Sequence, residues 1–181
     1  MPAARSLKAC ALQWLAQREQ SRVELRRKLL RRARADLASA ARPEDAREAL
    51  AEGVIEQVEA VLDWLESNGY LSAERFVESR VHARAARFGN LRIRQELAQH
   101  QVGLSGTLAQ TLGESEIDRA RAVRARRFAE PPRDAAERAR QARFLIGRGF
   151  SSDAVRAAFR DSGADTTGNA DDSEEVIAPG G

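Results

Sequence analysis

One short turn occurs three times in this sequence and constrains its fold more than any other feature. Each occurrence has an apolar helix end, a short polar or glycine-containing turn, a serine and then a new amphipathic pattern: QWLAQREQSRVEL (13–25), LDWLESNGYLSAERF (62–76) and RFLIGRGFSSDAV (143–155). A serine before an apolar periodic stretch is a helix N-cap signal, and glycine commonly ends the helix before it. The pattern predicts helices that reverse direction at short, capped joints.

The composition favours an all-α protein. Only five prolines occur in 181 residues, and the most frequent residues are helix formers. Cys10 is the single cysteine, which excludes an intramolecular disulfide and a cysteine-based zinc site. No apolar run approaches the roughly 20 residues that span a membrane, and the N-terminus lacks the apolar region of a secretory signal. We therefore expect a cytoplasmic protein that does not enter the membrane.

The helical periodicity can be followed along most of the chain. Helices are expected over 7–17, from the Ser21 cap onward, over 55–65, from the Ser72 cap to about 87, from an Asn90 cap through 97, over 104–112, 116–128 and 134–146, and from Ser151 or Ser152 to 159. The Ala-rich sequence from 34 to 53 interrupts the pattern. It predicts an insertion of an extra helical turn or two.

The helices group into units that resemble one another. Leu29, Leu97 and Leu145 occupy equivalent places on the second helix of each unit. The sequence predicts an elongated tandem array of three three-helix repeats: 1–67 with the insertion near 34–53, 68–113, and 114–162. Because such small units bury little apolar surface alone, neighbours must stack. A single irregular bundle with accidental self-similarity is the alternative.

The charge is unevenly distributed. Residues 163–181 contain five acids and no base, and they offer almost no apolar surface. This composition predicts a disordered acidic tail. Because the whole chain carries a net charge of +3, removing the five negative charges of the tail leaves a charge of about +8 on residues 1–162.

Three stretches, in order, carry a family resemblance: SRVELRRKL (21–29), GYLSAERFVESRVHARAARFGNLRIRQELAQHQV (69–102) and RFLIGRGF (143–150). Together they resemble the RecX family, regulators of the RecA recombinase, over about residues 7–160 apart from the insertion. The matched positions are Gly69, Tyr70, Leu71, Phe76, Gly89, Ile93, Glu96, Leu97, Phe144, Leu145, Arg148, Gly149 and Phe150. The chain departs from the family pattern at Ala73, where an acid is usual, at Gln101, where glycine is common, and at Gly147, where arginine is usual.

The resemblance implies a partner and a function. It implies three three-helix modules that lodge in the helical groove of the RecA–DNA filament. There the protein would inhibit ATP hydrolysis, strand exchange and co-protease activity, and would limit filament growth. It implies a monomeric regulator of recombination and DNA repair that is not an enzyme and needs no cofactor.

No motif for catalysis or metal binding occurs in the sequence. It contains no P-loop, no glycine-rich dinucleotide loop and no nucleophile elbow. His82 and His100 stand on different expected helices, and we interpret them as surface or packing histidines. The tryptophans are expected in cores and two aromatic turn residues at the joints between helices: Trp14 and Trp64, then Tyr70 and Phe150.

Arginines recur on the helices of each unit. On the helix after Ser72, a buried stripe of Val77, Val81, Ala85 and Phe88 is expected. Arg80, Arg84 and Arg87 form an unpaired stripe about 90° away from it at 100° per residue. Recurring stripes of one sign suit a polyanion or an acidic protein groove, whereas pairing with local glutamates is the alternative for about half of these residues. The candidate residues for binding the RecA filament or DNA are Arg27, Arg31, Arg80, Arg84, Arg87, Arg92, Arg94, Arg124, Arg127, Arg143 and Arg148.

Two classes of function are compatible with such a surface. The first is a protein that binds the RecA filament groove and inhibits the recombinase. The second is a helical repeat protein that binds nucleic acid without sequence specificity and acts without RecA. Weak binding to single- or double-stranded DNA is expected in both classes and should depend steeply on salt. The two classes are distinguished by whether the effect of the protein requires RecA.

Overall fold

The computed structural model describes residues 6–39 and 44–160. Within these residues the chain forms nine α-helices and no strand. The expected disordered tail, 163–181, lies outside the described residues. The helices are α1 (Leu7–Gln17), α2 (Arg22–Ser39), α3 (Glu44–Ser67), α4 (Ala73–Ala85), α5 (Asn90–Gln99), α6 (Gly106–Glu114), α7 (Glu116–Arg127), α8 (Ala135–Gly147) and α9 (Ser152–Arg160).

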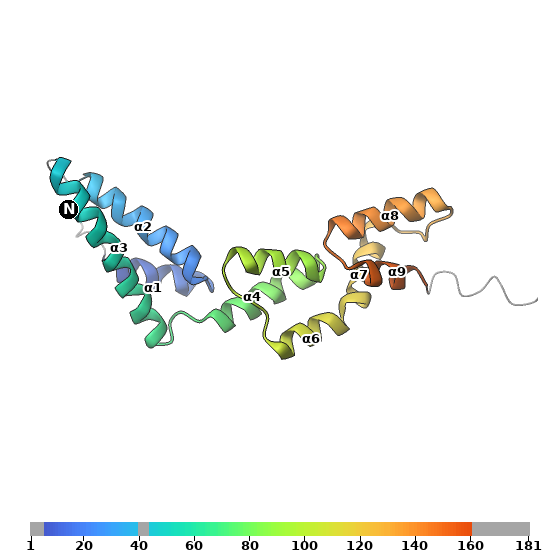
Figure 1. Cartoon of the computed structure of the whole chain (residues 1–181). Coiled ribbons are helices and arrows are strands. Elements are labelled where there is room, and N and C mark those ends of the chain that lie inside the picture. The colour runs from blue at the N-terminus through green and yellow to red at the C-terminus, as the bar shows by residue number, and fades with distance from the viewer. Residues whose placement is uncertain (1–5, 40–43, 161–181) are drawn as a thin grey trace, which may run out of the picture.

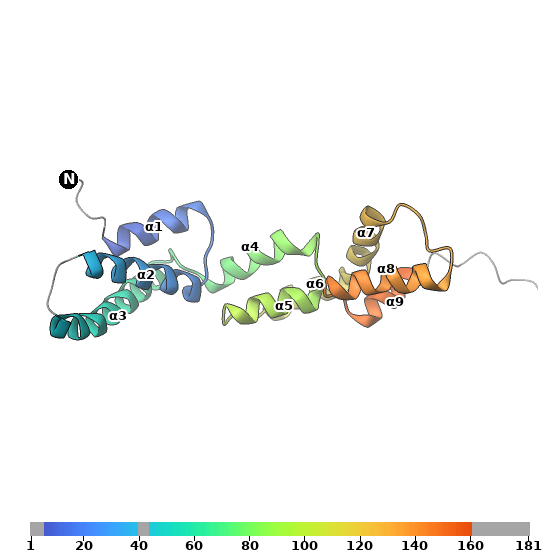
Figure 2. The same ribbon diagram turned by 90° about the horizontal axis from the view of Figure 1, so that it is seen from above.

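The helices follow one another in three groups along an extended body, as two perpendicular views show (Figures 1 and 2). We call α1–α3 the first repeat, α4–α6 the middle repeat and α7–α9 the third repeat. Each has its own apolar core cluster, and each core contains one of the three leucines aligned from the sequence: Leu29, Leu97 and Leu145. The prediction of an all-α, elongated array of helical repeats is confirmed.

Serine caps and glycine turns form the joints where the sequence predicts them. The hydroxyls of Ser21, Ser72 and Ser151 each accept a hydrogen bond from the backbone amide three residues later, at 3.1–3.2 Å. After α3 and α8 the chain turns through Gly69 (φ 72°) and Gly149 (φ 82°). Both lie in the left-handed region, where glycine avoids the steric cost of a Cβ atom.

Asn90 does not cap α5, in contrast to the sequence prediction. Gly89 is the N-cap, and Asn90 is the first helical residue and is buried. Its side-chain amide donates to the carbonyl of Leu112 at 3.2 Å, while its side-chain oxygen accepts from Arg119. The side chain is therefore turned away from its own helix and toward α6 and α7.

The stretch 34–53 lengthens the two helices on either side of it. α2 runs to Ser39 and α3 begins at Glu44, while residues 40–43 lie outside the described part. The spacing of Ile55, Val58 and Leu62 predicts a shared buried face for these residues, but Ile55 is 38% exposed. Among the described side chains of α3, burial in the core begins with Val58, one turn later.

The aromatic residues divide between cores and surface. Trp14 and Trp64 are partly buried against the core of the first repeat, and Phe150 is 1% exposed in the core of the third, as predicted. Tyr70 does not plug its joint. It is 49% exposed and stacks on Trp64 with ring centroids 5.4 Å apart, because the neighbouring Leu71 takes the buried position.

The two joints between repeats differ in kind. Side chains connect the first and middle repeats: the Ser21 hydroxyl lies 2.8 Å from His100 Nδ1, and Arg75 pairs with Glu19 at 2.8 Å. Backbone atoms connect the middle and third repeats. The amides of Gly89 and Leu91 at the start of α5 each donate to a carbonyl at the end of α8, both at 3.0 Å.

Candidate partner-binding surface

Arg119 at the joint between the middle and third repeats is a structural residue. Its guanidinium donates to the carbonyls of Phe88 (3.0 Å), Leu112 (2.8 Å) and Ala85 (3.3 Å), as well as to Asn90. Burial lowers the pKa of Arg119. Because carbonyls at the ends of α4 and α6 use its donors, Arg119 is unsuited to binding a partner.

Glu116 completes this joint from the same helix. Its carboxylate is buried and accepts from the backbone amide of Asn90 and the hydroxyl of Ser151, both at 2.8 Å. The carboxylate thus accepts hydrogen bonds at the N-terminal ends of both α5 and α9. Unpaired backbone donors at such helix ends favour a negative charge. Arg119 and Glu116 fix the middle and third repeats relative to each other.

Arg124 was a candidate binding residue, and the structure places it within the third repeat. Its guanidinium donates to the carbonyl of Ala158 at 2.8 Å and lies 4.8 Å from the ring centroid of Phe159. Burial, followed by the charge of Arg121, lowers the pKa of Arg124. The residue holds α7 against α9, and we leave it out of the candidate surface.

Arg80 and Arg84 were expected to be unpaired, but both contact one carboxylate. Glu96 on α5 accepts from Arg84 at 2.8 Å and lies 3.4 Å from Arg80. The packing of α4 on α5 places Glu96 opposite both arginines, a relationship between helices that spacing along α4 does not contain. Part of the predicted stripe therefore joins two helices.

Four arginines surround the ring of Phe88, which follows α4. The guanidinium carbons of Arg84, Arg87, Arg92 and Arg148 lie 5.5, 5.9, 5.3 and 5.5 Å from its centroid. They come from the end of α4, the start of α5 and the end of α8. We call these five residues the Phe88 cluster. Cation–π contacts of this kind contribute about 0.5–1 kcal/mol each at exposed sites, and here they hold the guanidiniums around one point.

Members of the Phe88 cluster line two hollows. The first is bordered by Arg84, Phe88, Arg92, Gln95, Glu96 and Gln99. The second is bordered by Ala86, Arg87, Val123, Arg126, Arg127, Phe144 and Arg148. Within the part of the chain that the structure describes, Glu96 is the carboxylate that pairs with a member of the cluster. The site combines concentrated positive charge with an aromatic surface.

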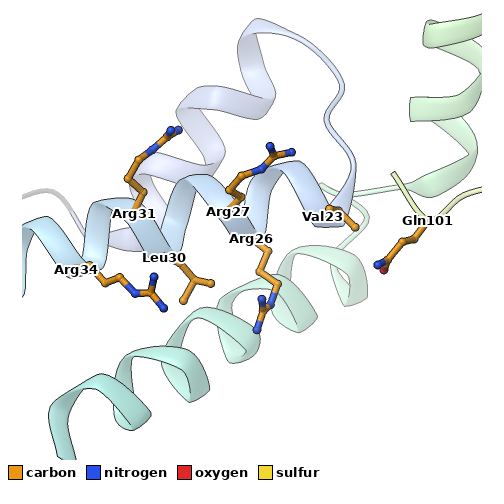
Figure 3. Close-up of a pocket in the computed structure, with 7 residues that line it drawn as sticks. All are labelled: Val23, Arg26, Arg27, Leu30, Arg31, Arg34 and Gln101. Carbon is orange, nitrogen blue, oxygen red and sulfur yellow. The ribbon is translucent and has the colours of Figure 1, made fainter. Parts of the chain in front are cut away.

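A second group of arginines borders a groove on α2 (Figure 3). The side chains of Arg27, Arg31 and Arg34 are exposed, and no ion pair joins them to another described residue. Arg26 points instead toward α3, where it pairs with Glu59. Val23 and Leu30 also line the groove, and Gln101 reaches it from the middle repeat. We call this the α2 groove.

The other predicted residues lie apart from these two sites or at their edge. Arg94 on α5 and Arg143 on α8 are exposed. Arg127 borders the hollow beside Arg87 and Arg148. Arg126, which sequence reasoning left out, donates to the carbonyl of Ala86 and borders the same hollow. No signal along α7 distinguishes Arg126 from its neighbours, because its acceptor belongs to another repeat.

The described residues contain no group of histidine, cysteine, aspartate and glutamate side chains arranged to hold a metal ion. Their helices also include none with the length and apolar character needed to cross a membrane.

His100 packs its ring against Phe76, with centroids 4.9 Å apart, while its Nδ1 contacts Ser21. Burial, followed by the charge of Arg80, lowers the pKa of His100.

Comparison with known proteins decides the family. The domain described as RecX, third three-helix domain, matches residues 114–159, which cover α7, α8 and all of α9 except its last residue. A regulatory protein RecX from Ralstonia nicotianae is 44% identical over 174 residues, covering 95% of each chain. The chain belongs to the RecX family. Regulatory proteins RecX from Ralstonia pickettii and Leptothrix cholodnii are each 45% identical, covering 83% and 86% of this chain and 84% and 88% of theirs.

The RecX resemblance predicted from three short stretches is thus confirmed over most of the chain. The relatives are named regulatory proteins, which agrees with a regulatory function. In this RecX-family chain the arginines form two separate sites, the Phe88 cluster and the α2 groove, together with scattered exposed residues.

Proposed function

We propose that this RecX-family protein binds the RecA–DNA filament and inhibits the activities of the recombinase: ATP hydrolysis, strand exchange and co-protease activity. It does so by occupying the groove of the filament and not by catalysis. The Phe88 cluster supports this proposal most strongly. Four guanidiniums on a fixed joint between two repeats suit the phosphates of filament-bound DNA or an acidic surface of the recombinase.

The extended body also supports groove binding. Three repeats in a row place the α2 groove and the Phe88 cluster at different points along the molecule (Figure 1). An elongated protein with separate basic sites can contact more than one subunit of a helical filament. Several modest contacts along one ligand give avidity when the geometry allows simultaneous binding.

The ATPase activity of RecA on single-stranded DNA, measured with and without the full chain, tests the proposal. Inhibition is expected, and it should be greatly weakened by the triple variant Arg87→Gln, Arg92→Gln and Arg148→Gln. The matched control removes three exposed arginines outside both sites: Arg133→Gln, Arg156→Gln and Arg160→Gln. Unchanged ATPase activity with the folded wild-type chain would refute the function, while equal inhibition by both triple variants would refute the site.

The second candidate function is direct, sequence-independent binding of nucleic acid without RecA. The Phe88 cluster supports it as well, because guanidiniums bind phosphates and an aromatic ring can stack on a base. An unrelated ATPase that depends on single-stranded DNA separates the two functions. Inhibition of RecA but not of that enzyme supports filament binding. Equal inhibition of both enzymes supports competition for DNA.

A further inference from the structure

The Phe88 cluster concentrates positive charge with little compensation nearby. Arg87, Arg92 and Arg148 form no ion pair with a described residue, and Arg84 shares Glu96 with Arg80. Guanidiniums held around one ring repel each other, so an anion that contacts several of them relieves this repulsion. The site therefore favours a ligand with several negative charges in a short span.

The chain contains such a ligand in its own sequence. The stretch DDSEE (171–175) has four carboxylates within five residues, and no base occurs between 163 and 181. Its four charges match the four guanidiniums of the Phe88 cluster in number. Carboxylate–arginine pairs are charge-assisted hydrogen bonds that are frequently bidentate.

The acidic stretch can reach the cluster from the end of α9. The last turns of α7 bridge the two regions: Arg124 donates to Ala158 on α9, while Arg126 donates to Ala86, two residues before Phe88. One helix therefore separates α9 from the end of α4, which corresponds to about 16–20 Å for two interaxial distances. Asp171 follows Arg160 by 11 residues, and 11 residues can span at most about 36–40 Å, so the distance lies within reach.

We propose that the acidic stretch 171–175 binds the Phe88 cluster of the same molecule and competes there with anionic groups of the partner. That this contact regulates binding to the filament rests on the proposed function, in which the Phe88 cluster is the surface that binds the filament. A tethered ligand has an effective concentration in the millimolar range. A contact that is weak between separate molecules is thus sufficient to compete within one molecule.

The full chain and a neutralised variant, D171N/D172N/E174Q/E175Q, test the contact without RecA. The probe is a fluorescent oligothymidylate, titrated at low salt. Neutralisation is expected to tighten its binding by about three- to tenfold. The gain should fade above roughly 0.3 M salt, because the Debye length then becomes shorter than the separation of exposed charges.

Two matched backgrounds locate the contact. In the cluster background, R87Q/R148Q, neutralising the acidic stretch should no longer change the affinity for the probe. In the groove background, R27Q/R31Q, which removes the same charge from α2, the gain should persist. Loss of the gain in the groove background alone would place the stretch on α2 and overturn the proposal. A gain in both backgrounds would show a general charge effect and would also overturn it.

Further outcomes separate this inference from the proposed function. No gain on neutralisation overturns the inference while leaving inhibition of RecA intact. A gain that depends on protein concentration shows contact between copies, which also contradicts it. If the gain is confined to the cluster but the full chain leaves the RecA ATPase unaffected, the intramolecular contact stands and the proposed function fails.

Discussion

The backbone of Gly89 at the start of α5 lies directly against that of Phe150 after α8. A Cβ atom on Gly89 would lie 2.2 Å from the amide nitrogen of Phe150, closer than non-bonded atoms can approach. This proximity lets the amide of Gly89 donate to the carbonyl of Arg148 at 3.0 Å. The unpaired amides of one helix start and the carbonyls of another helix end thus satisfy each other.

Gly89→Ala is therefore expected to push the start of α5 away from the end of α8 and to destabilise the protein. The added methyl group meets backbone atoms, which cannot rotate away, and overpacking of this kind typically costs about 1–3 kcal/mol. Gly113→Ala is the control, because a Cβ atom there has nothing within 4 Å and alanine favours a helix. Urea unfolding should show a loss for Gly89→Ala and none for Gly113→Ala. Equal stability of the two variants would contradict the close approach.

Leu97→Ala tests the core of the middle repeat. Leu97 is 1% exposed in that core, so its truncation leaves a cavity and should cost about 2–5 kcal/mol of unfolding free energy. Leu91→Ala on the same helix is the control, since Leu91 is 52% exposed and surface changes usually stay within about 0.5 kcal/mol. A negligible loss for Leu97→Ala in thermal or urea unfolding would show that the middle core is not the one described.

Gln101→Gly should stabilise the protein. Gln101 has φ 58°, a left-handed conformation that costs a residue with a side chain about 1–2 kcal/mol. Glycine removes this cost but adds about 0.5–1 kcal/mol of unfolded-state entropy, so a net gain of roughly 0.5–1 kcal/mol is expected. Gln101→Ala, which keeps the Cβ atom, should not show the gain. A decrease in stability on Gln101→Gly would be inconsistent with the observed turn.

His100 should make stability depend on pH at the joint between the first and middle repeats. Burial and the charge of Arg80 lower its pKa, with Arg27 acting in the same direction and Glu24 and Glu96 in the opposite one. As the pH falls below the ordinary imidazole pKa of about 6.5, the unfolded chain takes up the proton first, so stability decreases. Above that pH both states are neutral and the contribution is absent.

The comparison for this prediction is His100→Gln, which offers Ser21 an amide that does not titrate. Unfolding free energies of both proteins at pH 7.5 and pH 5.5 give the measurement, with the difference between proteins removing the effect of other groups. The wild type should lose more stability on acidification. Parallel pH dependence in the two proteins would refute a role for His100.

Local patterns in the sequence predicted the helices and their caps well, because these depend on residues close along the chain. Ser21, Ser72 and Ser151 cap helices as expected. The contacts between repeats could not be predicted in this way. In the sequence, Arg119 is one of several arginines on α7 with nothing to set it apart, but its acceptors are carbonyls of another repeat. Asn90 is a residue type that often caps helices, yet Gly89 is the N-cap of α5 and the Asn90 side chain contacts α6 and α7 instead.

The candidate site likewise combines features that the sequence predicted with contacts that it could not predict. The periodicity of α4 separated Phe88 and the valines from Arg80, Arg84 and Arg87, and the core clusters agree with that division. It did not show that Arg148, sixty residues further along, would join the ring of Phe88. Nor did it show that Glu96 would neutralise part of the stripe. Charge and spacing identify which residues are polar on a helix, whereas their partners depend on the packing of helices far apart in sequence.

The difference between the two joints determines how the molecule bends. The middle and third repeats share backbone hydrogen bonds and the contacts of Arg119 and Glu116, so we expect them to move as one rigid unit. The first repeat is attached through side-chain contacts such as those of Ser21 and Arg75, and we expect its joint to be the more flexible of the two. We therefore expect adaptation to a curved surface to cost conformational entropy mainly at the joint between the first and middle repeats. Motion there changes the distance between α2 and Gln101 across the α2 groove, whereas the Phe88 cluster keeps its shape.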